Sequence, residues 1–171
     1  YAVFDSGGLK TPAFGITRVN TLSGDLVFEK DMDAPRERIL SEHTVANMNT
    51  MMRAVITSGT GRRADVPGVP AVGKTGTTTS YRDAWFCGFT GNYVAAVWFG
   101  NDDYRPTKDL TGGVLPAIAW QKFMAYAHTN TEIKPLFGVD FVPEQTIVAE
   151  APQDEAEVVA ERPPSLTPAA A

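Results

Sequence analysis

Residues 71–101 contain three consecutive segments with the composition of β-strands, and this run constrains the fold more than any other feature. Residues 71–79 are rich in β-branched side chains, residues 83–90 carry Trp85, Phe86 and Phe89, and residues 93–99 are almost entirely apolar. Gly91-Asn92 forms a tight turn signal between the last two segments. Because strands without polar alternation are usually buried on both sides, we expect a sheet with helices packed on its faces.

Two other segments, 41–57 and 114–128, have the pattern of amphipathic helices. In the first, Ser41 can accept a hydrogen bond from an unpaired backbone N–H as the N-cap, and Glu42 is favourable in the first turn. Gly59 is placed to end this helix in the left-handed conformation. The apolar positions that recur at helical spacing are Val45, Met48, Met52, Val55 and Ile56.

The chain reads as one domain followed by an acidic tail. Its 171 residues fit a single domain, and 43% hydrophobic residues suffice for a core. Short β-like runs at 13–19 and 25–28, separated by Ser23-Gly24, predict an exposed hairpin. Residues 1–128 hold 13 basic and 12 acidic residues, whereas residues 129–171 hold 2 and 8. We expect a domain over 1–128, a packed extension over 129–143 and a disordered Pro/Ala-rich tail over 144–171.

Composition argues against several functional classes. The net charge of −5 argues against nucleic acid as a partner, because phosphate binding needs clustered cations. No segment approaches the roughly 20 apolar residues that cross a bilayer. Cys87 is the only cysteine, so neither an internal disulfide nor a metal-ligand cluster is expected. We also expect no cofactor. The chain begins at Tyr1 without a signal sequence, and we interpret it as a piece of a longer protein.

Residues 68–75 match the G-x-x-x-x-G-K-T pattern of a phosphate-binding P-loop. That pattern binds phosphate only where a buried strand enters the loop and a helix leaves it. Here residues 61–67 are polar with Pro67, and residues 76–80 begin with Gly76 followed by β-branched threonines, which start helices poorly. Nucleotide binding therefore remains only a remote alternative.

Lys74 also belongs to the tetrad Lys74-Thr75-Gly76-Thr77, which reads as part of a β-strand. An ammonium beside a nucleophile supplies a positive field for an anionic substrate. The hydroxyls of Thr75 and Thr77 can donate to the same anion, and Gly76 leaves room for an extended substrate against the strand. The backbone N–H of Thr77 can point at a developing oxyanion.

The tetrad lies within a series of further motifs whose order resembles the C-terminal part of the transpeptidase domain of class A, bifunctional penicillin-binding proteins. The resemblance covers residues 1–128 and excludes the acidic tail. The motifs are Gly15-Ile16-Thr17-Arg18, Ala34-Pro35-Arg36, Gly59-Thr60-Gly61-Arg62-Arg63-Ala64, Gly73-Lys74-Thr75-Gly76-Thr77, Tyr81-Arg82-Asp83-Ala84-Trp85-Phe86, Val97-Trp98-Phe99-Gly100-Asn101-Asp102-Asp103 and Thr111-Gly112-Gly113.

The resemblance implies a partial serine β-lactamase/transpeptidase-like fold of the α/β (α+β) class. It also implies a peptidoglycan D,D-transpeptidase that cross-links stem peptides through a serine acyl-enzyme and binds β-lactams. Lys74, Thr75 and Thr77 would bind the substrate carboxylate, Thr77 would also donate its backbone N–H to the oxyanion, and Gly76 would keep the groove open. The implied location is the extracytoplasmic (periplasmic) face of a bacterial cytoplasmic membrane, in which the parent protein is anchored.

The family's nucleophile motif S-x-x-K and its S-x-N motif are both absent from the sequence. Residues three after the six serines are Leu9, Leu26, Thr44, Gly61, Asp83 and Pro168, and none is lysine. We therefore expect the isolated chain to be inactive and its partner to be the missing N-terminal part of the same protein. The alternative is a non-catalytic scaffold or binding domain that retains this fold.

Overall fold

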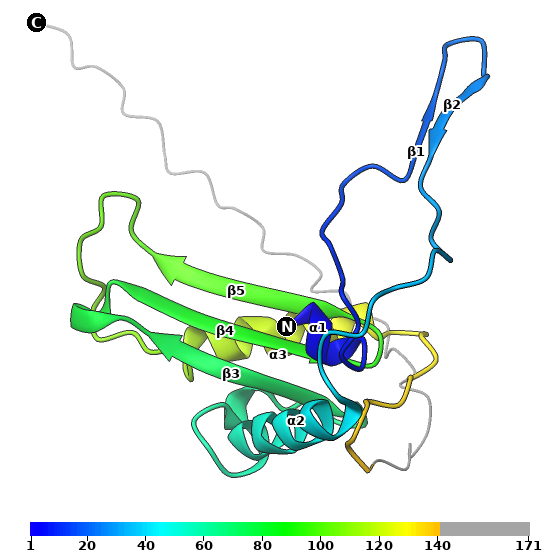
Figure 1. The fold of residues 1–171 in the computed structure, drawn as a ribbon. Helices are drawn as coiled ribbons and strands as arrows, with labels where there is room; N and C mark the ends of the chain where they lie inside the picture. Colours follow the sequence, from blue (N-terminus) through cyan, green and yellow to red (C-terminus); the bar gives the residue numbers. More distant parts are fainter. Residues whose placement is uncertain (141–171) are drawn as a thin grey trace, which may run out of the picture.

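The computed structural model describes residues 1–140, in which a three-stranded antiparallel sheet packs against helices (Figure 1). The order in the sheet is β3-β4-β5, so neighbours in sequence are also neighbours in space. This architecture confirms the predicted α+β class with an antiparallel sheet. The elements are α1 (Ala2–Asp5), β1 (Arg18–Asn20), β2 (Leu26–Glu29), α2 (Glu42–Thr57), η1 (Arg62–Ala64), β3 (Ala71–Thr77), η2 (Thr79–Tyr81), β4 (Asp83–Thr90), β5 (Val94–Gly100) and α3 (Leu115–Ala127).

The register of the sheet assigns each side chain to one of its two faces. Thr75 pairs with Phe86, and Phe86 pairs with Val97, so these three share a face. Side chains alternate between the faces along a strand, so Lys74, which precedes Thr75 and pairs with Cys87, lies on the opposite face. Trp85 and its partner Trp98 lie on that face too. We call these the Phe86 face and the Trp85 face.

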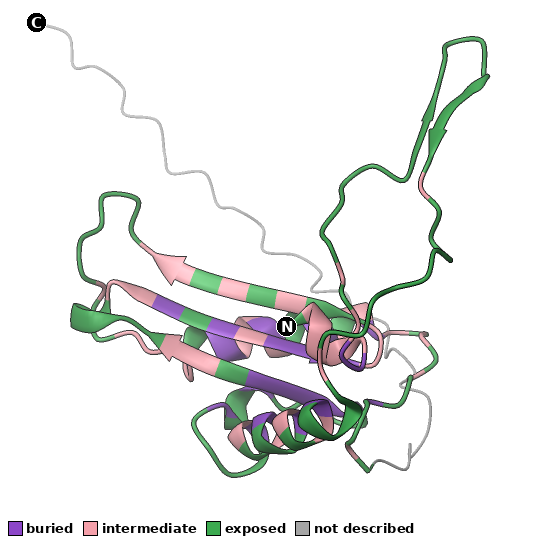
Figure 2. Cartoon of the chain, in the orientation of Figure 1, coloured by how far each residue is buried: buried purple, intermediate pink, exposed green. Residues whose placement is uncertain are grey.

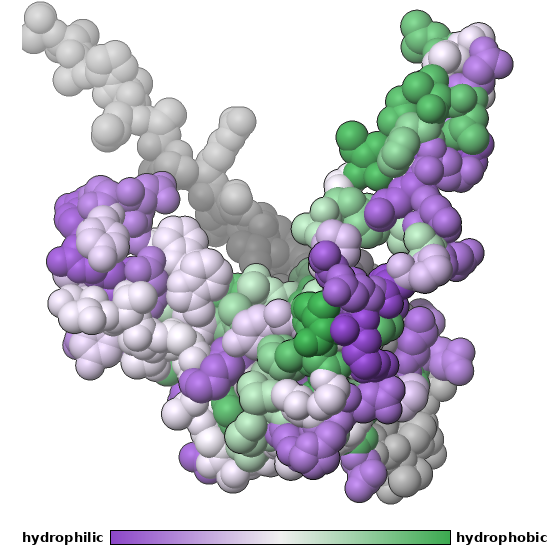
Figure 3. Space-filling view, in the orientation of Figure 1, coloured by the Kyte–Doolittle hydropathy of each residue, from purple (hydrophilic) through white to green (hydrophobic). Residues whose placement is uncertain are grey.

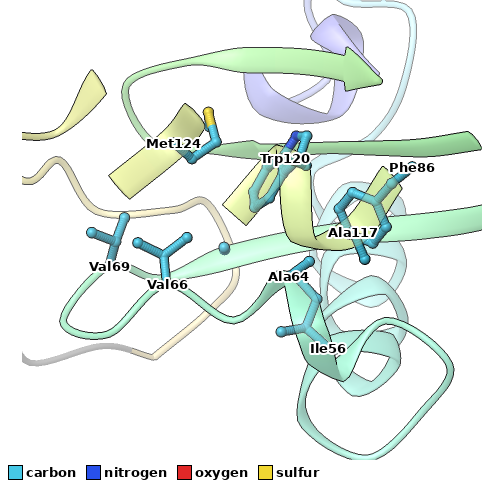
Figure 4. Close-up of a cluster of buried hydrophobic side chains, with 9 residues drawn as sticks. Ile56, Ala64, Val66, Val69, Phe86, Ala117, Trp120 and Met124 are labelled. Carbon is cyan, nitrogen blue, oxygen red and sulfur yellow. The ribbon is translucent and has the colours of Figure 1, made fainter. Parts of the chain in front are cut away.

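The main hydrophobic core lies on the Phe86 face, beneath α3 (Figure 4). The rings of Phe86 and Trp120 are 5.1 Å apart, and both side chains are fully buried. The indole Nε1 of Trp120 donates to the Ala95 carbonyl at 3.1 Å, so its polar atom is satisfied inside the core. Because Ile56 of α2 joins the same cluster, one core holds both long helices against the sheet.

The Trp85 face is covered only at one end. There Val72 and Phe89 pack in a second cluster with Met52, Leu136 and Phe4. Farther along the strands, Trp85 and Trp98 remain 39% and 42% exposed, with ring centroids 6.2 Å apart. Figure 2 shows exposed segments along β3, β4 and β5. The expectation that apolar strands are covered on both faces thus holds for only part of the sheet, because apolar composition alone does not show how far the covering elements extend.

Helix α2 begins as predicted but ends differently. The Ser41 hydroxyl accepts a hydrogen bond from the Thr44 N–H at 3.1 Å and caps the helix. Gly59, expected in the left-handed conformation, is not among the residues with positive φ. An added Cβ there would lie 2.8 Å from the Val55 Cα, so glycine is needed because the chain turns back closely over the last helical turn.

Residues 10–37 form an arm that extends away from the sheet and carries β1 and β2 at its end (Figure 1). The predicted hairpin is present, but β1 is shorter than the run 13–19, and β2 is shifted by one residue from the run 25–28. Apolar side chains on the arm, among them Ile16 and Val27, are 60% and 63% exposed (Figure 3). Few cross-strand pairs form because no core within the described residues 1–140 lies against either strand, and both strands are exposed throughout.

The segment that follows α3 packs against the turn between β4 and β5. The Asn92 side chain donates to the Glu132 carbonyl and accepts from the Lys134 N–H, both at 3.0 Å, and Leu136 is buried. The boundary at residue 128 stays a prediction. The expected tail over 144–171 and the last residues of the expected extension lie outside the described residues.

The variant Asp5→Asn is expected to be more stable than the wild type at neutral pH. Burial raises the pKa of the Asp5 carboxyl above its ordinary 3.8, and Lys134 opposes this shift only in part. The folded state therefore favours the protonated acid, and stability falls as the pH rises from 3.8 through the raised pKa. Urea unfolding at pH 7 should show the gain, which should disappear below pH 3.8. Exposed Asp33→Asn is the control, and a destabilised Asp5→Asn at pH 7 would contradict the assignment.

Candidate active site

The tetrad Lys74–Thr77 lies on a free edge of the sheet. Within residues 1–140, β3 pairs with β4 alone. The Thr78 N–H donates to the Asp83 carbonyl at 3.0 Å, so the backbone of residue 78 faces β4 and that of Thr77 faces away from it. By the same alternation Thr75 also faces away. The N–H groups and carbonyls of Thr75 and Thr77 therefore line the open side of β3.

The Lys74 side chain is exposed and folds back around this edge. Its Nζ donates to the Thr75 carbonyl at 2.9 Å and lies 3.4 Å from the Thr75 Oγ1. No carboxylate of residues 1–140 forms an ion pair with it. The ammonium charge therefore remains available to an anion at the edge of β3.

The two threonine hydroxyls of the tetrad are each held by a partner from another loop. The Thr77 Oγ1 accepts from the Gly112 N–H at 3.2 Å, and the Thr75 Oγ1 lies 2.7 Å from the Thr60 Oγ1. A hydroxyl has one donor hydrogen and two acceptor lone pairs. Because the bond from Gly112 uses only a lone pair of Thr77, the Thr77 O–H can still donate to a ligand.

Gly76 is enclosed on both sides of the strand. An added Cβ would lie 3.2 Å from the Trp85 Cβ on one face. On the other face Gly112 is so close that its own added Cβ would be 2.6 Å from the Gly76 carbonyl oxygen. Packing within the protein therefore favours glycine at position 76, in addition to the predicted role of leaving space beside the strand.

Sequence reasoning noted the motifs around Thr60 and Gly112 but assigned these two residues no role. In the structure they belong to two loops that contact β3 on the Phe86 face. The Thr60 loop follows α2, and the Gly112-Gly113 loop precedes α3, where an added Cβ on Gly113 would lie 2.2 Å from the Thr60 carbonyl oxygen. The tetrad thus contacts two loops that also pack closely against each other, and each loop contains two glycines.

Cys87 lies opposite Lys74 in the register, but it is a poor nucleophile there. The thiol is half-buried, and burial raises its pKa, with only partial opposition from the N-terminal amine. The thiol form therefore predominates at neutral pH. Among residues 1–140, no group of three or more His, Cys, Asp or Glu side chains could hold a metal ion.

The P-loop interpretation of Lys74 is wrong. Ala71–Thr77 is a β-strand, so the lysine projects from extended chain and not from a loop that opens a helix. The turn that follows is a three-residue 3-10 segment, Thr79–Tyr81, interrupted by Ser80 at φ 60°. The helix N-terminus that would bind phosphate is absent from this part of the described structure.

Comparison with known families agrees with this geometry. Residues 1–116 match the family described as "Penicillin binding protein transpeptidase domain". The chain belongs to this transpeptidase family. The match includes β3 with the tetrad, both loops behind it and the projecting arm, so the arm is part of the penicillin-binding domain. The resemblance seen in the sequence motifs is confirmed.

Individual relatives are also penicillin-binding proteins. Penicillin-binding protein 1A of Clostridium acetobutylicum is 31% identical over 137 residues, which cover 80% of this chain and 16% of the relative. That of Aquifex aeolicus is 31% identical over 155 residues, which cover 90% and 21%. The solved structure of the penicillin-binding protein PonA1 from Mycobacterium tuberculosis is similar in fold, with a TM-score of 0.70 at 24% identity over 86% of this chain and 43% of that one.

The chain thus spans only 16% and 21% of the length of these two curated relatives. No helix within residues 1–140 is both long and apolar enough to pass through a bilayer.

Proposed function

We propose that this chain forms one side of the active site of a serine-type D-Ala-D-Ala transpeptidase that cross-links peptidoglycan stem peptides. The observation that carries the proposal is the free edge of β3. It places two hydroxyls, the outward backbone of Thr75 and Thr77, and an ammonium that forms no ion pair within residues 1–140 along one open strand. Such an edge suits an extended peptide that ends in a carboxylate.

The reaction we assign is acyl transfer in two steps. A serine oxygen attacks the carbonyl of the penultimate D-alanine, and the terminal D-alanine leaves with a proton after the C–N bond breaks. An amine from a neighbouring strand then attacks the acyl-enzyme, which closes the cross-link and frees the serine. β-Lactams acylate the same serine because their strained amide presents a similar carbonyl and a carboxylate.

In this scheme Lys74 attracts the substrate carboxylate, and Thr75 and Thr77 donate their hydroxyls to it. The Thr77 N–H, on the free edge of β3, donates to the oxyanion that develops on the attacked carbonyl. Gly76 lets β3 approach both Trp85 and the substrate closely. The contributions of Lys74, Thr75 and Thr77 stabilise negative charge, and none of the four residues supplies the nucleophile.

We place the nucleophile in a longer protein that contains this chain, called the parent protein below. The sequence holds neither S-x-x-K nor S-x-N. The parent would be anchored in the cytoplasmic membrane and act on its outer side, where peptidoglycan is assembled. The chain would then contribute the carboxylate and oxyanion sites, and the rest of the parent would contribute the serine and its base.

Labelling with a fluorescent penicillin tests this proposal. We expect the parent protein to form a stable adduct that survives denaturation and that unlabelled benzylpenicillin prevents. The isolated chain should not be labelled under the same conditions, because it contains no acylating serine. A stable adduct on the isolated chain, or no adduct on a folded parent, would overturn the proposal. The second result would favour a non-catalytic scaffold with the same fold.

A further inference from the structure

Thr60 is held rigidly although it lies in a surface loop. The Gly61 N–H next to it donates to the Val55 carbonyl at 2.9 Å, and an added Cβ on Gly61 would lie 3.0 Å from Phe86 and from Val55. On its other side, the Thr60 carbonyl packs against Gly113. These contacts fix the Thr60 backbone between α2 and the loop before α3, with its hydroxyl directed at β3.

The contact between Thr60 and Thr75 joins two hydroxyls, so either one can donate. Lys74 carries only donor hydrogens, so its ammonium occupies an acceptor lone pair of the Thr75 oxygen. If Thr75 donated to Thr60, it would have no hydrogen left for a substrate carboxylate. If Thr60 donates to Thr75, the Thr75 oxygen accepts twice and its own hydrogen points outward. A bound anion therefore selects the second arrangement.

We propose that Thr60 is a positioning residue for the carboxylate site: its hydroxyl donates to the Thr75 Oγ1 and keeps the Thr75 O–H available to the ligand. The proposal rests on the proposed function and extends it to a residue outside the tetrad. Thr60 acts through Thr75, 15 positions away, and touches no reacting atom. The Gly112 N–H has a parallel role at the other hydroxyl: it donates to the Thr77 Oγ1 and leaves the Thr77 O–H available to the ligand.

The test uses Thr60→Val and Thr60→Ser in the parent protein with benzylpenicillin. Valine keeps the shape of threonine but removes the hydroxyl, and we expect the second-order rate constant of acylation to fall about five- to tenfold, as for loss of one hydrogen bond. The loss should appear as weaker initial binding, because the affected group contacts the carboxylate. Serine restores the hydroxyl and should recover most of the rate.

Two comparisons separate this role from simple support of the fold. Thr57→Val makes the same change at an exposed hydroxyl whose one side-chain hydrogen bond within residues 1–140 runs to the Arg53 carbonyl of its own helix, and it should leave acylation unchanged. The double variant Thr60→Val/Thr75→Val should acylate no more slowly than Thr75→Val alone, because Thr60 acts only through Thr75. Additive losses, or an unchanged rate in Thr60→Val, would overturn the proposal.

A measurement on this chain alone tests the role of Thr60 independently of the proposed function. NMR couplings across the Thr75 Cα–Cβ bond should report one χ1 rotamer in the wild type and averaging in Thr60→Val. If the parent is never labelled by penicillin, the proposed function fails, whereas the rotamer result still decides whether Thr60 holds Thr75. Identical couplings in both proteins would show that it does not.

Discussion

The variant Lys74→Ala of the parent protein is expected to react with benzylpenicillin about 10²–10³ times more slowly than the wild type. The Lys74 ammonium is the cation at the open edge of β3, and no carboxylate of residues 1–140 neutralises it. Within residues 1–140 its hydrogen bonds run only to Thr75, so its removal takes the positive field from the carboxylate site and leaves the sheet intact.

The matched control for this experiment is Lys122→Ala, which removes the same charge from an exposed position on α3. We expect both variants to unfold in urea within about 0.5 kcal/mol of the wild type, as is usual at surface positions. A Lys74→Ala protein that acylates as fast as the Lys122→Ala protein would show that the tetrad is not part of the site.

The variant Gly112→Ala is expected to lose both stability and acylation. An added Cβ would lie 2.1 Å from the Trp85 carbonyl oxygen and 2.9 Å from the Gly76 nitrogen, and neither backbone atom can rotate away. The loop must move off β3, which breaks the hydrogen bond from the Gly112 N–H to Thr77. We expect about 1–3 kcal/mol of destabilisation, typical of overpacking, and at least tenfold slower acylation.

Gly15→Ala serves as the control for the glycine change, because nothing lies within 4 Å of the added Cβ and its φ is not positive. Urea unfolding of this chain measures the stability loss, and penicillin acylation of the parent measures the effect on the site. Equal stability of Gly112→Ala and Gly15→Ala would contradict the close approach of the loop to β3.

Local pattern was enough to predict the elements that form the site. The β-branched threonines after Lys74 favour a strand, and the Ser41 cap with apolar positions at helical spacing marks α2. These features depend on neighbours a few residues away. For the same reason residues 61–67 and 76–80 already favoured a strand edge over a P-loop.

The remaining features depend on contacts between distant residues. Thr60 meets Thr75 across 15 positions, and Gly112 meets Thr77 across 35, so neither contact follows from spacing along the chain. Gly59 could be identified as a helix-ending residue, but its conformation is set by the return of the chain over Val55. The partial cover of the Trp85 face likewise depends on where α1 and Leu136 pack.

The most direct test of the central claim is a crystal structure of the parent protein acylated by benzylpenicillin. We predict that the penicillin carboxylate lies within about 3.2 Å of the Thr75 and Thr77 hydroxyls, and that the acyl oxygen accepts from the Thr77 N–H. The acylated serine should lie outside the 171 residues of this chain. A carboxylate bound away from β3, with the acyl oxygen turned from Thr77, would contradict the assignment.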